Sequence, residues 1–272
     1  MKKLAKILFW ILSRRYSVEL KGEHVLKGGA PRLYLPNHQA EVDPIVLLSV
    51  IQMYHKAAPM ISAMYYNVPV FKQFLDLMGS VPVSDLDRGV RDPNVMKTIS
   101  DAANTAFAKG NGILLYPSGH LCNQGYEDIG NKQGAYNIVK SSPDDLRIIG
   151  VRMAGFWGSK WSRAWSGVSP NFTKLFLESI FWWFSNFIFF IPKRKVVFEF
   201  FDITEDAKDK AKNLKRREFN EYLEKIYNKN GEEKIRYIRH HFLAPKVKKA
   251  VPKRIKGVVN DNIKEIVFIK NK

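Results

Sequence analysis

The chain has 272 residues, of which 46% are hydrophobic and 26% charged, so it is neither a disordered chain nor a protein with several membrane spans. Its 44 Lys and Arg residues against 26 Asp and Glu give a net charge of +18, which predicts a polyanionic partner, either nucleic acid or an anionic membrane surface. The single cysteine, Cys122, excludes a disulfide scaffold and a Cys-clustered metal centre and fits a reducing compartment.

The first predicted element is an apolar N-terminal segment over residues 4–12, with basic residues on both sides. It is too short to cross a bilayer, which takes about 20 apolar residues. It also lacks the small-residue cleavage site of a secretory signal, because Ser13 is followed by Arg14 and Arg15. We therefore expect residues 1–16 to form a helix that associates with a membrane surface.

Residues 17–203 alternate between strand and helix signals. Short apolar runs predict strands at residues 17–20, 32–35, 80–83, 112–116, 147–151 and 195–201. Helices are predicted to begin at Asp43-Pro44 and at Asp92-Pro93, because Asp is a good N-cap and Pro suits the first helical position. This alternation predicts an α/β domain with a mixed, partly parallel sheet flanked by helices.

A second apolar segment covers residues 174–192 and is followed by three basic residues at 193–195. It is rich in Phe and Trp, and its few polar side chains fall in two pairs seven positions apart, which places them on one stripe of a helix. A helix with a polar stripe, an aromatic body and a basic flank is typical of the bilayer interface. We expect an interfacial or re-entrant segment; a buried core helix and a membrane span are the alternatives.

Residues 204–272 are predicted to form a basic, helical C-terminal extension. A helix is indicated between residues 213 and 230, and six Lys and Arg residues gather between Pro245 and Gly257. The sequence has no helix-turn-helix pattern, no paired Cys/His finger and no RNA-binding sheet signature, so a nucleic-acid partner is not expected. Attraction to anionic lipid headgroups explains the charge better.

The best candidate for chemistry is the segment over residues 37–43, in which His38 follows a strand and Asp43 opens the next helix. Across such a loop a carboxylate can hold one imidazole nitrogen and leave the other free to take a proton. The ordinary pKa of His, about 6.5, suits a general base near neutrality. The alternative is that Asp43 only caps the helix and that His38 is an ordinary loop residue.

This segment resembles the first sequence block of the glycerophospholipid acyltransferases, the lysophosphatidate acyltransferase group. Three more blocks follow in the family's order: Gly-Ser-Val-Pro-Val at residues 79–83, Leu-Tyr-Pro-Ser-Gly-His at 115–120 and Ile-Ile-Gly-Val at 148–151. The resemblance covers residues 15–203, and the ordered set is much more specific than any one block.

The resemblance implies a membrane-surface enzyme of phospholipid synthesis or remodelling, on the cytoplasmic face. It would move an acyl group from acyl-CoA or acyl carrier protein to a hydroxyl of a lysophospholipid, with His38 as general base and Asp43 as its orienting partner. No metal and no cofactor are expected. The substrate-binding candidates are Asn37, Arg88, Arg91, Ser118, Gly119, His120 and Arg152, with Lys132 as a further cation for a phosphate.

The sequence departs from the family pattern in the third block. The family has Glu and, three positions later, Arg in this block, and this chain has Ser118 and Leu121 there. The Tyr-Pro-Ser-Gly-His form of this block, followed by Arg152 and the Gly- and Trp-containing stretch at 155–163, resembles the acylglycerophosphoethanolamine acyltransferase branch. Because the usual phosphate-binding residues are missing, an aminolipid or another hydroxylated lipid is an alternative acceptor. A catalytically silent, basic membrane-binding protein on the same scaffold is the alternative from another functional class.

Overall fold

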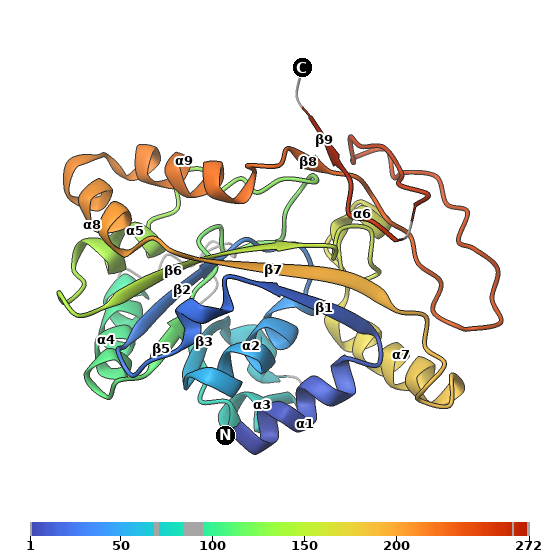
Figure 1. Cartoon of the computed structure of the whole chain (residues 1–272), viewed down its shortest axis with the longest axis horizontal. Helices are drawn as coiled ribbons and strands as arrows, with labels where there is room; N and C mark the ends of the chain where they lie inside the picture. The colour runs from blue at the N-terminus through green and yellow to red at the C-terminus, as the bar shows by residue number, and fades with distance from the viewer. Residues whose placement is uncertain (1, 68–70, 84–94, 263, 271–272) are drawn as a thin grey trace.

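The computed structural model describes residues 2–67, 71–83, 95–262 and 264–270 (Figure 1). The strands are β1 (Tyr16–Lys21), β2 (Arg32–Pro36), β3 (Ala57–Ser62), β4 (Val81–Val83), β5 (Gly112–Leu114), β6 (Arg147–Ala154), β7 (Arg194–Asp202), β8 (Glu232–Glu233) and β9 (Phe268–Ile269). The α-helices are α1 (Lys2–Leu12), α2 (Asp43–Tyr54), α3 (Phe71–Leu77), α4 (Val95–Ala108), α5 (Gly134–Lys140), α6 (Arg163–Ser166), α7 (Phe172–Ser185), α8 (Thr204–Asn213) and α9 (Arg216–Tyr227). The short 3-10 helices are η1 (Glu23–Leu26) and η2 (Ala63–Asn67).

The described strands form one seven-stranded sheet in the order β1-β7-β6-β2-β5-β3-β4, and β8 pairs with β9 separately. Within the large sheet only β6 and β7 run antiparallel. This confirms the predicted α/β fold with a mixed, partly parallel sheet, and the observed sheet is mostly parallel. The central strands β2, β5 and β6 therefore end at the same edge, where ligands bind in open α/β sheets.

Each face of the sheet is covered by its own layer of helices. Leu114 and Val151 face a core that includes α2, α3 and the first residue of α7, and α1 packs on α2. Ile113 and Ile148 face a second core built with α4, α5, α8 and α9. In Figure 1, α8 and α9 lie on the opposite side of the sheet from α1, α2 and α3. A side chain's place along a strand therefore decides which helices it meets.

The C-terminal part is less helical than the sequence predicts. The last described helix, α9, ends at Tyr227, and between there and residue 270 the only described regular elements are the two-residue strands β8 and β9. Pro245 and Pro252 interrupt this stretch and hinder a helix. Instead, Ile235, Tyr237 and Ile255 pack around Trp157 in a small third core. The helical extension over residues 204–272 was therefore wrong beyond Tyr227.

The two apolar segments form helices α1 and α7 that leave large apolar side chains exposed. In α7 only Phe172 is buried, while Leu177, Phe181 and Phe184 each expose about 60% of their surface (61%, 61% and 62%). This excludes the alternative of a buried core helix. Within the described ranges, none of the helices is both long and apolar enough to span a bilayer.

Two glycines test how the C-terminal segment is held against the loop after β6. Gly158 has a φ of 89°, and a Cβ added there would lie 2.5 Å from the carbonyl oxygen of Arg236. Gly79 has a similarly positive φ of 69° but no atom within 4 Å of such a Cβ. Backbone strain should make Gly79→Ala lower the free energy of unfolding by roughly 1–3 kcal/mol. We expect Gly158→Ala to lower it by more, because its Cβ also meets the main chain of Arg236. Urea denaturation measures both, and equal effects would contradict the close contact.

Candidate active site

His38 and Asp43 meet at the carboxyl edge of the sheet, in the loop between β2 and α2. The imidazole Nδ1 lies 3.1 Å from Asp43 Oδ1 and 3.3 Å from Oδ2. The Asp43 side chain is completely buried, whereas that of His38 keeps 14% of its surface exposed. With Nδ1 facing the carboxylate, Nε2 is the nitrogen left for a substrate.

Asp43 holds the loop in addition to the imidazole. Its Oδ2 accepts the backbone N–H groups of Gln39 at 2.7 Å and Ala40 at 2.8 Å. The N-cap position of α2 is occupied by Val42, so the expectation that Asp43 caps its own helix was wrong. The side chain points back into the loop because that is where the unpaired N–H donors and the imidazole lie.

The surroundings of His38 favour a charged imidazole. Burial lowers the pKa of His38, but the negative charge of Asp43 and its hydrogen bond act in the other direction. Glu41 and Glu127 add to that effect, and the net pKa lies above its usual 6.5. The imidazole can therefore take up a proton readily, which is what a general base does.

Tyr116 is a member of this site that the sequence analysis did not single out. Its hydroxyl donates to Asp43 Oδ1 at 2.9 Å, and its ring centroid lies 4.2 Å from that of His38. Burial raises the pKa of Tyr116 well above its usual value, so the hydroxyl keeps its proton and remains a donor. The alternation of side chains along the strand could have predicted this position, because Tyr116 follows Leu114 by two residues and thus lies on the same face of the sheet.

Glu127 is the second member that was missed. Its Oε2 accepts the backbone N–H of His38 at 2.8 Å and the thiol of Cys122 at 2.9 Å. The backbone N–H of Cys122 donates in turn to the carbonyl of His38 at 2.7 Å. Glu127 is separated from His38 by 89 positions, and no pattern in the sequence connects the two residues.

The predicted substrate-binding residues near His38 and Asp43 differ in how exposed they are to solvent. The buried amide of Asn37 is used by the sheet, since it accepts from Met153 N at 2.6 Å and donates to Met153 O at 3.0 Å. Ser118 is fully buried and donates to the carbonyl of His120 at 2.9 Å. Gly119 is exposed with a φ of 64°, and His120 is half-buried. Gly119 and His120 are thus the accessible members of this turn.

The predicted phosphate-binding cations are not gathered at His38 among the described residues. Arg152 is buried on the α9 side of the sheet, where its Nε donates to Tyr227 O at 2.9 Å and its Nη1 lies 3.4 Å from Glu199. Lys132 lies in the segment before α5, where its carbonyl accepts from Asn220 of α9. Arg88 and Arg91 lie outside the described residues.

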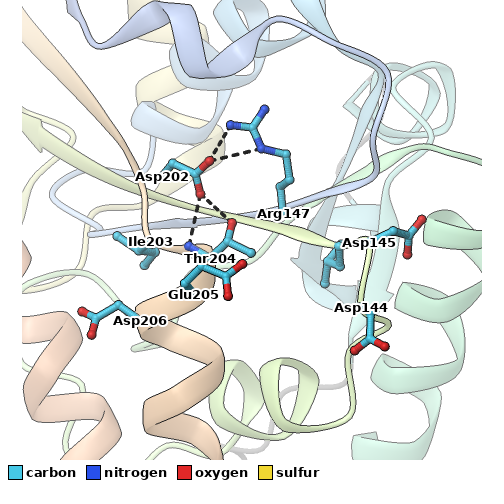
Figure 2. A pocket seen from close by; sticks show the side chains of 9 residues that line it. Asp144, Asp145, Arg147, Asp202, Ile203, Thr204, Glu205 and Asp206 are labelled. Carbon is cyan, nitrogen blue, oxygen red and sulfur yellow. Dashed lines mark hydrogen bonds and ion pairs between the residues drawn. The ribbon is translucent and has the colours of Figure 1, made fainter.

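A cavity of about 430 Å³ lies at the other edge of the sheet (Figure 2). Its walls include Arg147 at the start of β6 and Asp202 at the end of β7, which form an ion pair, and several acidic side chains around them. Because β2 and β6 run parallel, with Arg32 opposite Arg147 and Pro36 opposite Val151, this cavity lies at the end of the strands remote from His38. It is not part of the site around His38 and Asp43.

Comparisons with known proteins concern the family and the fold of this chain. A family model described as "Acyltransferase" matches residues 17–154. Among solved structures, the 1-acyl-sn-glycerophosphate (LPA) acyltransferase PlsC from Thermotoga maritima is similar, with a TM-score of 0.50 and 15% sequence identity. The similarity covers 84% of this chain and 75% of that chain. No curated protein matches the sequence.

The coupling between Asp43 and His38 predicts a measurable shift. Replacing Asp43 by Asn removes the charge that opposes the effect of burial, so the pKa of His38 should fall. NMR titration of the imidazole signals measures it, with Asp206→Asn as a control because Asp206 is paired with Lys210 in α8. An unchanged His38 pKa in Asp43→Asn, with the fold intact by circular dichroism, would contradict the pair described above.

Proposed function

Because the chain belongs to the acyltransferase family, we propose that it transfers a fatty acyl group from an acyl thioester to a hydroxyl of a lysophospholipid. The thioester would be acyl-CoA or acyl carrier protein. The observation that carries the proposal is the buried Asp43 carboxylate on Nδ1 of His38, which leaves Nε2 free at the carboxyl edge of the sheet. The fold it shares with PlsC, an enzyme that acts on a glycerophosphate lipid, supports the lipid substrate.

The proposed step needs no covalent enzyme intermediate. His38 Nε2 removes the proton of the acceptor hydroxyl while the acceptor oxygen attacks the thioester carbonyl carbon. The new C–O bond forms, the C–S bond breaks, and the departing sulfur takes the proton from the imidazolium. Asp43 keeps the imidazole oriented and stabilises its positive charge between the two proton transfers.

The acceptor's headgroup is a finer question, for which two candidates remain. A lysophospholipid with a free phosphate monoester fits the likeness to PlsC. Two features favour an acceptor with a cationic or amine-bearing headgroup, such as lysophosphatidylethanolamine or an aminolipid. Leu121, at the family's Arg position, is buried, and Glu41 adds a negative charge close to His38, with its carboxylate accepting from Tyr65 at 2.6 Å.

Replacing His38 by Ala tests the catalytic proposal. We expect the transfer rate to fall by about 10²–10⁴-fold, the usual contribution of a general base. The assay offers a panel of lysophospholipids and one aminolipid to acyl-CoA and acyl-carrier-protein donors, and identifies the products by mass. His24→Ala, on η1 at the far end of β2, is the matched control. Wild-type rates in His38→Ala, or no product from any pair, would favour the silent membrane-binding alternative.

We also propose that the enzyme works at the anionic, cytoplasmic face of a membrane. Its contact surface would be the aromatic surface, which we define as the exposed apolar side chains of α1, α7, residues 187–190 and residues 242–243. In Figure 1, α1 and α7 lie on the side of the molecule away from α8 and α9. The exposed members are Ile7, Trp10, Ile11, Leu177, Ile180, Phe181, Phe184, Phe187, Phe189, Phe190 and Leu243.

Contacts join three of the four parts of the aromatic surface, namely α1, residues 187–190 and residues 242–243, and residues 187–190 follow α7 in the chain. The Arg14 guanidinium lies 4.6 Å from the ring centre of Trp10 in α1 and 5.9 Å from that of Phe189. The Phe242 ring lies 5.5 Å from that of Phe190. Aromatic rings beside arginines suit the headgroup region of an anionic bilayer, where the rings enter the interface and the cations remain near the phosphates.

Vesicle binding tests this surface. Binding to phosphatidylglycerol-containing vesicles should weaken as salt is raised, because exposed charges are screened. Phe189→Ala should weaken binding roughly tenfold at every salt concentration, since burying one aromatic side chain contributes about 1.5–3 kcal/mol. Val258→Ala, at an exposed apolar residue next to Ile235, should bind like the wild type. Binding that is indifferent to both salt and Phe189→Ala would refute the proposed surface.

A further inference from the structure

We propose that Glu127 is a positioning residue of the acyl-transfer reaction: its carboxylate holds the backbone of His38 and so fixes the imidazole that acts as base. This inference rests on the proposed function. Glu127 lies outside the four sequence blocks, in the loop between β5 and α5, and the structure brings it to the catalytic loop.

The loop that contains Glu127 holds His38 at both of its backbone polar groups. The N–H of His38 donates to Glu127 Oε2, and the C=O of His38 accepts from Cys122 N, at 2.8 and 2.7 Å. Asp43 then holds the side chain through Nδ1. The main chain and the ring of His38 are thus fixed by different elements. A small displacement of a catalytic group lowers reaction rates strongly, so this backbone support bears directly on the rate.

Glu127 is itself anchored to the end of α9. Its backbone N–H donates to Asn228 Oδ1 at 2.9 Å, and its carbonyl accepts from Asn228 Nδ2 at 2.8 Å. Its side chain is almost fully buried, with 2% exposed, and the Cys122 thiol donates to the same oxygen that holds His38. The carboxylate therefore has a fixed place between α9 and the catalytic loop.

A carboxylate at this place also acts on the charge of the imidazole. The titratable groups around it are His38, Cys122, Tyr116 and Tyr227. Burial raises the pKa of Glu127 to about 7, against the hydrogen bonds from the Cys122 thiol and the His38 N–H. Above that pH the carboxylate is charged, accepts the His38 N–H strongly and stabilises the imidazolium.

Glu224 of α9 offers a matched control. Its Oε1 accepts the backbone N–H groups of Ile129 at 2.7 Å and Gly130 at 3.1 Å, so it supports the same loop as Glu127. Its hydrogen bonds go to that loop and not to His38. A change from carboxylate to amide at Glu224 therefore disturbs the loop's support while leaving the His38 contacts in place.

The experiment compares the wild type with Glu127→Gln, Glu127→Asp and Glu224→Gln in the full-length chain. Acyl transfer from acyl-CoA to the best acceptor of the panel is measured as kcat and KM across pH 5–9, with thermal unfolding of each variant. We expect Glu127→Gln to lower kcat roughly ten- to a hundredfold with little change in KM, because a neutral amide accepts the His38 N–H more weakly than a carboxylate does and no longer stabilises the imidazolium. The acidic limb of its kcat/KM profile should move to lower pH, because a negative charge that raises the pKa of His38 has been removed.

Glu127→Asp separates the two contributions. It keeps the charge but shortens the side chain, so kcat should fall while the acidic limb stays nearer to the wild-type position. If Glu127→Gln does not fold, Glu127→Asp tests the inference by itself. A reduced kcat in that variant would support the positioning role, and a wild-type kcat would contradict it. Glu224→Gln should lower the unfolding temperature and leave the pH profile unchanged.

Two results would overturn the inference. The first is that Glu127→Gln keeps the kcat and the acidic limb of the wild type. The second is that Glu224→Gln shifts the pH profile as Glu127→Gln does, which would show that the effect comes from the stability of the loop alone. Either can occur while His38→Ala abolishes transfer, so the proposed function would survive. Full activity in His38→Ala would instead remove the proposed function itself.

Discussion

The proposed catalytic site depends on the hydrogen bonds made by the buried carboxylate of Asp43. A buried charge is costly unless it is paired and fully hydrogen-bonded. Asp43, with no exposed surface, satisfies this requirement through the N–H groups of Gln39 and Ala40, the hydroxyl of Tyr116 and the imidazole of His38. Two backbone donors in the loop, one side chain after β5 and the base itself therefore meet at a single group, and the loop can adopt few other conformations.

The sheet explains why these groups meet. The strands β2, β5 and β6 run parallel, so their carboxyl ends lie together and the segments that follow them share one edge. The loop after β2 carries Gln39, whose Oε1 accepts the N–H of Phe156 after β6 at 3.1 Å. Its Nε2 donates to Glu233 of β8 at 2.8 Å, which ties the same loop to the C-terminal segment. The loop that contains His38 is thus supported by parts of the chain that lie beyond residue 154, where the family match ends.

Much of the fold follows from local patterns in the sequence. The strands with β-branched or aromatic runs, β1, β2, β6 and β7, were predicted within a few residues, and so was the start of α2 at Asp43-Pro44. Strand β3 was missed because Ala57–Ser62 contains two alanines and a proline, which are poor strand formers. The helical periodicity before residue 230 was read correctly, as α9 shows, whereas the packing of the later segment around Trp157 depends on contacts that no local pattern encodes.

The site residues likewise include some that a local pattern predicts and some that only the tertiary fold brings together. The spacing of His38 and Asp43 in the sequence predicted their contact, because the two residues lie in one short strand-to-helix connection. The sequence analysis could not find Glu127, whose contact with His38 is made only by the tertiary fold. It also named Arg152 without reference to its strand face, and the alternation along β6 places that side chain with Tyr227 and Glu199 instead. The sequence blocks show which side chains are present, whereas the fold of the sheet determines which other residues each side chain contacts.

A double-mutant cycle on the two central residues tests the account most directly. It compares kcat/KM of the wild type, the Ala variant at His38, the Ala variant at Asp43 and the double variant, in the same acyl-transfer assay. If the carboxylate acts only through the imidazole, the double variant should be no slower than the His38 variant alone. Losses that simply add would show that the two side chains act independently and would contradict the account.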